Sequence, residues 1–166
     1  VLLWASKGAF AFGMAKPVPV NFARLNNPRR DMVWVAAAGP GANMVMAVIG
    51  SVLLAVTSPD GGIAMEWLRA NFAAATAINV LLAVFNMLPI PPLDGGRVAV
   101  GLLPNFIAIP LARLERIGIF IVLGAIFLLP SFGINFFGSV ILPVVSVLLS
   151  LIGAPSLFEL PDLVTF

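Results

Sequence analysis

The chain has 166 residues, of which 61% are hydrophobic and 10% charged, and its formal net charge is +2 at pH 7. Soluble domains carry about 25% charged residues. The composition therefore excludes an ordinary water-soluble domain and predicts one integral membrane domain over residues 1–166, with the lipid bilayer as a partner. The basic residues form no stripe, so no nucleic-acid partner is expected. Without cysteine, disulfides and thiolate metal sites are excluded.

The first 26 residues contain two unlike segments. Val1 to Phe12 is apolar but too short to cross a bilayer, which takes about 20 residues. It resembles the end of a truncated transmembrane helix. The following Lys16-Pro17-Val18-Pro19-Val20-Asn21 alternates proline and valine, which excludes a helix. An edge strand that pairs with an extended peptide and a polyproline-like linker are both compatible with this pattern.

Four long apolar runs predict transmembrane helices, over residues 32–57, 68–88, 111–129 and 134–152. A short helix is expected over 94–103, ending at Pro104. Positive charge flanks the first run and follows the second, at Lys16, Arg24, Arg29, Arg30, Arg97, Arg113 and Arg116. Under the positive-inside rule, residues 16–21 and Asp94 face the cytoplasm, and residues 58–67 face outside.

The second apolar run breaks at three prolines, Pro89, Pro91 and Pro92, and then delivers Asp94 onto a double glycine. In lipid, such a break survives only where protein or a water-filled cavity satisfies the freed backbone groups. A carboxylate at membrane depth costs roughly 2.5–3.5 kcal/mol on insertion scales, so Asp94 is a candidate functional residue. Two structural alternatives remain: Asp94 caps the next helix, or it pairs with Arg97 at i+3.

Three ordered motifs carry a family resemblance. Asn86-Met-Leu-Pro-Ile-Pro-Pro-Leu-Asp-Gly-Gly-Arg97 resembles the Asn-x-x-Pro-x-x-Pro-x-Asp-Gly signature of the site-2 protease family, the intramembrane zinc metalloproteases of peptidase family M50. Residues 13–21 resemble the Gly-Trp-Ala-Lys-Pro-Val-Pro-Val-Asn segment of its compact bacterial branch, with Met14 in place of tryptophan. Residues 30–43, which contain Ala-Gly-Pro-Gly-Ala-Asn, resemble the next helix of that branch. Taken by themselves, the glycines of this third motif favour close helix packing.

The resemblance implies an all-α, polytopic transmembrane helix bundle with a short extended Pro-Val segment at the membrane edge. It implies regulated intramembrane proteolysis of transmembrane protein substrates, by a multi-pass protein of the bacterial inner membrane. Asp94 is then a Zn²⁺ ligand, and Asn86 contacts the substrate or stabilises the oxyanion. The segment that would hold the substrate extended is Lys16, Pro17, Val18, Pro19, Val20 and Asn21.

One departure from the family pattern is large. The family also uses two histidines and a glutamate in a His-Glu-x-x-His helix, and this chain has no histidine. We therefore expect a fragment that lacks its N-terminal helices and is itself inactive. A non-catalytic membrane scaffold of the same family is one alternative. A transporter or channel is another, because broken helices also mark those proteins, although no inverted repeat is present.

Overall fold

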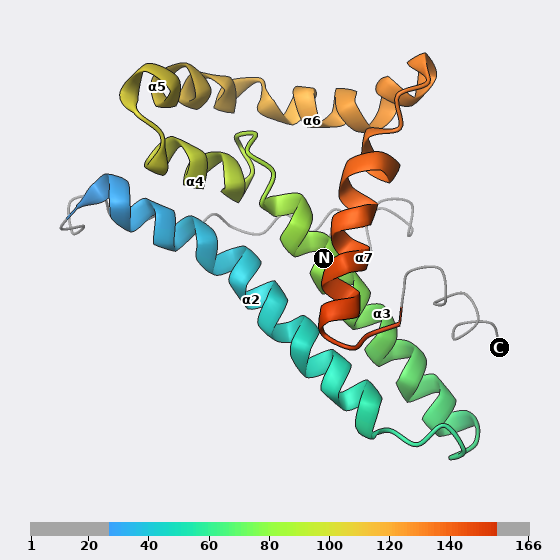
Figure 1. Ribbon diagram of the computed structural model, residues 1–166. Coiled ribbons are helices and arrows are strands. Elements are labelled where there is room, and N and C mark those ends of the chain that lie inside the picture. The colour runs from blue at the N-terminus through green and yellow to red at the C-terminus, as the bar shows by residue number, and fades with distance from the viewer. Residues whose placement is uncertain (1–26, 156–166) are drawn as a thin grey trace, which may run out of the picture.

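The computed structural model describes residues 27–155, and in this range every regular element is helical (Figure 1). The all-α prediction is therefore confirmed for that range, whereas the Pro-Val segment 16–21 lies outside the described residues. The helices are α2 (Pro28–Val56), α3 (Ile63–Asn86), α4 (Asp94–Leu102), α5 (Asn105–Arg113), α6 (Gly118–Phe127) and α7 (Leu142–Leu151). Shorter turns are η2 (Leu114–Arg116), η3 (Leu129–Phe132) and the π-helical η4 (Phe137–Ile141).

Helices α2 and α3 form an antiparallel hairpin that supports the rest of the molecule (Figure 1). Both are long and apolar enough to cross a membrane, with 29 and 24 residues. At 1.5 Å per residue each exceeds the roughly 30 Å of a hydrocarbon core. The two helices approach closely at Gly50, where an added Cβ would lie 2.5 Å from the Thr76 hydroxyl oxygen. Two of the four predicted spans are thus present at nearly the predicted residues.

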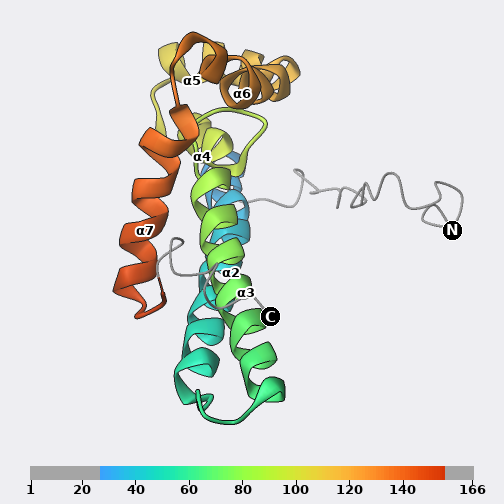
Figure 2. The same ribbon diagram turned by 90° about the vertical axis from the view of Figure 1, so that its right-hand side faces the viewer.

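The predicted third span, 111–129, is wrong in this structure. Helix α5 ends at Arg113, η2 follows, and α6 has only 10 residues, which is about 15 Å or half of a hydrocarbon core. Figures 1 and 2 show α5 and α6 as a layer across the end of the hairpin where α2 begins. The layer is held in place at Gly118, which is buried so tightly against the proline loop that an added Cβ would overlap the Pro91 carbonyl.

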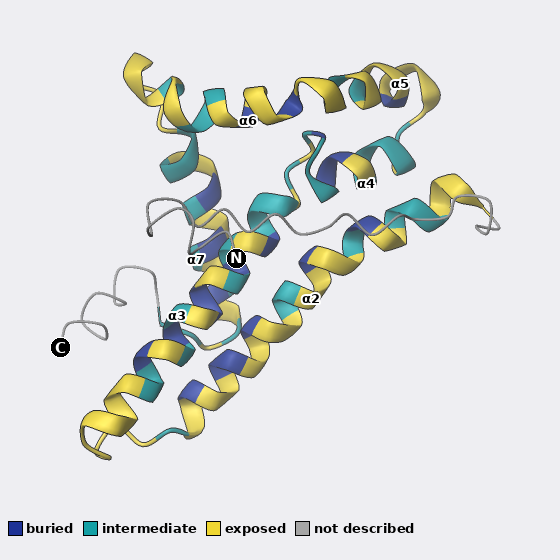
Figure 3. Ribbon diagram, turned by 180° about the vertical axis from the view of Figure 1, so that it is seen from behind, coloured by how far each residue is buried: buried dark blue, intermediate teal, exposed yellow. Residues whose placement is uncertain are grey.

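The fourth apolar run folds as η4 and α7, a continuous helix over Phe137–Leu151 that packs along α3. It has nearly the predicted bounds but is shorter than a span. Its buried side chains meet both long helices in one core cluster, formed by Ala47, Val80, Ile141, Val145 and Leu149. Figure 3 shows that burial is confined to the inner helix faces, whereas the outer faces are exposed. Such apolar outer faces are typical of helices that contact lipid.

Candidate functional site

The proline loop between α3 and α4 folds back onto the start of α4. Two glycines permit this, because a Cβ at Gly95 would overlap the Met87 carbonyl and one at Gly96 would overlap the Pro91 nitrogen. Pro91 itself is fully buried. The first turn of α4 is therefore held against the loop backbone, close to the carboxyl end of α3.

Asp94 is the first residue of α4 and is half-buried. It does not cap the helix, since the N-cap position belongs to Leu93 and carries no side-chain hydrogen bond. It does not pair with Arg97 either, because the Arg97 guanidinium lies 2.9 Å from a Glu115 carboxylate oxygen. Neither structural alternative from the sequence holds, and the Asp94 carboxylate makes no ion pair within residues 27–155.

The carboxylate of Asp94 lies against helix α2. An added Cβ on Gly39 would sit 3.0 Å from Asp94 Oδ2, whereas one on Gly41 would meet no atom within 4 Å. Gly39 thus lies at a close contact between α2 and α4, as the packing interpretation expects, and it makes room for the carboxylate. For Gly41, which faces open space, that interpretation is wrong. The next residue, Pro40, lies inside the helix and removes the donor that the Ala36 carbonyl would otherwise use.

Asn86 is the last residue of α3 and is half-buried. Its neighbour Met87 contacts Gly95 through the carbonyl, so Asn86 and Asp94 flank one tight backbone contact. The other asparagine of this helix, Asn79, donates its side-chain N–H to the Ala75 carbonyl at 2.8 Å, within its own helix. Of the two asparagines, Asn86 is therefore the one that the fold brings to the candidate site.

An apolar cavity of about 530 Å³ opens between α2, α3 and α7, beside the same contact. It begins at Pro40 and Gly41, directly after Gly39, and reaches Met87 and Leu88, directly after Asn86. The remaining lining residues are also apolar: Ala37, Met44, Ala83, Val84, Val144 and Leu148. The site thus combines one carboxylate and one amide, with an open apolar recess beside them.

These residues fit part of a zinc site and not a complete one. Catalytic zinc takes three protein ligands and leaves one position open. Within residues 27–155 no three potential ligands among His, Cys, Asp and Glu lie close enough to hold a metal ion, and the sequence contains neither histidine nor cysteine. Asp94 therefore fits as a single ligand. The predicted substrate-binding residues Lys16–Asn21 lie outside the described part of the chain.

Two contributors to the site carried little or no signal in the sequence. Gly39 could have been found through the Ala-Gly-Pro-Gly-Ala-Asn motif, but the motif alone does not reveal that Asp94 is its neighbour. Gly118, which anchors α6 to the proline loop, had no signal at all. Both contacts join residues far apart in the chain, so only the fold reveals them.

Comparison with known proteins agrees with this geometry. The model of peptidase family M50 matches residues 55–129, which include α3, the proline loop and Asp94. "Putative zinc metalloprotease YwhC" of Bacillus subtilis is 37% identical over 126 residues, covering 72% of this chain and 56% of that protein. "Putative zinc metalloprotease MJ0611" of Methanocaldococcus jannaschii is 39% identical over 64 residues, covering 39% of this chain and 31% of that protein. No solved structure matches.

The class defined by fold and site is a helical protein with a proline-broken helix that presents one carboxylate beside an apolar recess. The chain belongs to the site-2 protease family, peptidase family M50. It spans about half the length of the Bacillus subtilis relative and about a third of the archaeal one.

Proposed function

We propose that the protein carrying this chain is an intramembrane zinc metalloprotease that cleaves transmembrane substrate proteins. Family membership and the names of both relatives support a zinc-dependent protease. The observation that carries the proposal is the position of Asp94, half-buried beside Gly39 and unpaired within the described range. Placing a carboxylate at membrane depth costs free energy, so such residues usually have a function, and metal ligation is one such function.

Each residue of the site has a role in this proposal. A zinc ion held by three protein ligands supplies an activated water at neutral pH. Asp94 contributes one ligand. In the family pattern the other two ligands and the general base belong to a His-Glu-x-x-His helix, and the 166 residues contain no histidine. Asn86 donates its amide N–H to the substrate carbonyl or to the oxyanion that develops from it. The apolar cavity places apolar side chains on one side of these residues.

The substrate is a membrane-spanning segment that is locally unwound. A helical peptide keeps its carbonyls in its own hydrogen bonds, so the scissile bond becomes accessible only in extended form. The segment Lys16–Asn21 would pair with that extended stretch as an added strand. The positive charge near α2 and α4 orients the site toward the cytoplasm of a bacterial inner membrane.

The test of Asp94 combines metal content with activity. In the full-length protein, Asp94→Asn should lower cleavage of a transmembrane substrate by more than about 100-fold, because even changes that only reorient a ligand cost about 10–100-fold. Zinc content, measured by mass spectrometry, should fall in parallel because a neutral amide is a poorer ligand. The matched control is Asp60→Asn, in the exposed loop at the other end of the hairpin, and it should leave both quantities unchanged.

Arg97→Gln separates ligation from local structure. Arg97 pairs with Glu115 and not with Asp94, so this variant should keep its zinc and most of its activity. Full zinc and full activity in Asp94→Asn would contradict the ligand assignment. If the unmutated full-length protein contains no zinc and cleaves no substrate, the result would instead support the non-catalytic scaffold.

A further inference from the structure

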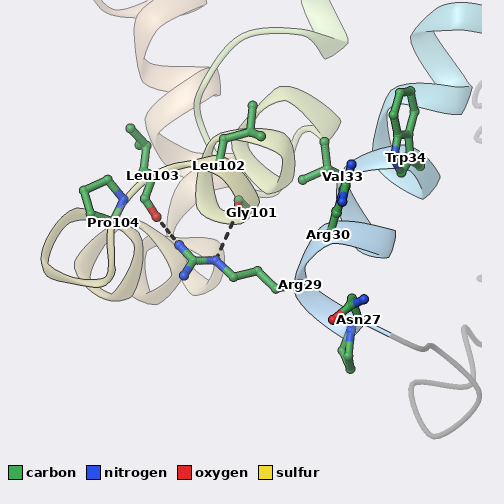
Figure 4. A pocket seen from close by; sticks show the side chains of 10 residues that line it. Asn27, Arg29, Arg30, Val33, Trp34, Gly101, Leu102, Leu103 and Pro104 are labelled. Atoms are coloured by element: carbon green, nitrogen blue, oxygen red, sulfur yellow. Dashed lines mark hydrogen bonds between the residues drawn. The ribbon is translucent and has the colours of Figure 1, made fainter.

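A second cavity, of about 810 Å³, lies away from Asp94, between the first turn of α2 and the end of α4 (Figure 4). Its floor is built where the two helices touch, since an added Cβ at Gly101 would overlap the Val33 side chain. The volume falls within the range of about 300–1,000 Å³ that is usual for small-molecule sites. Its lining mixes cationic, aromatic and aliphatic groups, which suits an amphiphilic ligand.

Arg29 forms the wall of this cavity and does not serve as its ligand-binding cation. Its guanidinium donates to the Gly101 carbonyl at 3.1 Å, the Asn105 side-chain oxygen at 2.7 Å and the Leu103 carbonyl (Figure 4). These partners occupy the donors of Arg29 and fix the carboxyl end of α4 to α2. The cavity is therefore a built feature of the fold.

Arg30 is the second cation of this cavity and, unlike Arg29, it does not fix α4 to α2. It is exposed, lines the same cavity and forms no ion pair within the described part of the chain. The neighbouring acid, Asp31, accepts a hydrogen bond from the Asn27 backbone N–H at 3.1 Å. In the sequence, residues 1–26 contain no acid, and their charged residues are Lys7, Lys16 and Arg24. Among the described residues, Arg30 and its neighbour Arg29 are the two cations that line this cavity.

Trp34 follows Arg30 by four residues, so its indole lies one helical turn further along the same face of α2. It is 70% exposed and lines the cavity, as does Leu102, which is also 70% exposed. Tryptophan at the end of a membrane-spanning helix is typical of the headgroup level of a bilayer. The cavity therefore brings together a cation, an indole and an aliphatic side chain, which are the groups that a charged headgroup with an apolar tail would contact.

We propose that this cavity binds the headgroup of an anionic phospholipid, with Arg30 contacting the phosphate and Trp34 and Leu102 contacting the glycerol and upper acyl region. The proposal rests on the membrane insertion of α2 that the proposed function assumes. Soluble phosphate would use Arg30 but would gain nothing from the exposed indole and leucine beside it. The exposed cation Arg30 and the exposed apolar side chains of Trp34 and Leu102 together favour the lipid.

Fluorescence quenching by brominated lipids tests the proposal in the full chain. The chain has three tryptophans, so Trp4→Phe with Trp67→Phe leaves Trp34 as the reporter, and Trp4→Phe with Trp34→Phe leaves Trp67. In vesicles, brominated phosphatidylglycerol should quench Trp34 more than equally brominated phosphatidylcholine does. The preference of the Trp34 site for phosphatidylglycerol over phosphatidylcholine should fall about fivefold when Arg30→Gln is added. One basic side chain near an anionic surface contributes about 1 kcal/mol of binding free energy, which corresponds to that factor.

Two controls make the result decisive. Arg113→Gln removes the same charge from the last turn of α5, outside this cavity, and should leave the Trp34 preference unchanged. Trp67, at the opposite end of the hairpin, should be quenched equally by both lipids. Equal quenching of Trp34 by both lipids, an equal effect of Arg113→Gln, or loss of the preference with inorganic phosphate would each overturn the proposal. If neither lipid quenches Trp67, membrane insertion fails instead.

Discussion

Asp94 and Gly39 form the closest link between the proline loop and helix α2. The space that a glycine leaves is filled by the carboxylate, so the position of Asp94 Oδ2 depends on the absence of a side chain at residue 39. This dependence can be separated from the general effect of glycine on helix stability. Gly41, two residues later, shares the helix but faces open space.

Gly39→Ala should displace the carboxylate, because a Cβ at 3.0 Å from Asp94 Oδ2 is closer than ordinary contact. We expect zinc content and cleavage in the full-length protein to fall, while thermal stability holds or rises. Alanine stabilises a helix by about 0.8–1.0 kcal/mol relative to glycine. Gly41→Ala should show that gain and keep its zinc, because the new Cβ would extend into the apolar cavity without meeting Asp94. Equal activity of the two variants would show that Asp94 does not need this space.

The sequence singles out candidate site residues but does not give their contacts. Asp94 and Asn86 follow from a local motif, because a proline-broken helix and a buried acid are visible in a short stretch. The Arg97–Glu115 pair and the Gly39–Asp94 contact join separate helices, so their formation depends on packing that no local pattern encodes. The i+3 spacing suggested an Asp94–Arg97 pair, but Glu115 on η2 competes for the same guanidinium.

At the scale of elements, arginines fasten the carboxyl ends of two helices. Arg29 donates to the last carbonyls of α4, and Arg69 donates to the Leu54 carbonyl at 3.1 Å and to the Thr57 carbonyl at the end of α2. The last carbonyls of a helix lack the usual i+4 partner and carry the negative end of the helix dipole. The Leu54 carbonyl also accepts the Thr57 backbone N–H at 3.3 Å, so Arg69 is its second donor. Both contacts tie the end of one helix to a neighbour.

The proline loop is fastened differently, by glycine contacts with the helices that follow it. Gly118→Ala should destabilise the protein by about 1–3 kcal/mol, the usual cost of overpacking, because the new Cβ would overlap the Pro91 carbonyl. Gly124→Ala is the matched control in the same helix, with its nearest neighbour, Leu128 Cδ1, at 3.8 Å. Thermal unfolding in detergent compares them. Similar melting temperatures would mean that α6 does not press on the loop.

At the scale of the whole molecule, the structure and the sequence differ in how many helices are long enough to cross a membrane. Hydropathy counted residues 111–129 as a span because their apolar content is high. The break at η2 and the anchoring of Gly118 depend on the loop beneath them, which a running average cannot register. The two long helices were predicted correctly because length and composition suffice for them.

Cysteine labelling distinguishes the two topologies, and the chain contains no cysteine of its own. Asn27→Cys, Asp60→Cys and Ser131→Cys each place a thiol at an exposed position. The layer formed by α5 and α6 lies at the end where α2 begins, so residues 27 and 131 should be labelled from one side and residue 60 from the other (Figures 1 and 2). If residues 131 and 60 are labelled from the same side of the membrane, the predicted third span over residues 111–129 is correct after all.

The contact between Gly118 and Pro91 joins segments that are made at different times. During synthesis, α3 and the proline loop emerge before α6 does, so at that stage Gly118 does not yet cover Pro91. The loop that leads to Asp94 therefore gains this contact only after α6 has been made and has docked. We expect the loop to reach its final packing late in the biogenesis of the protein.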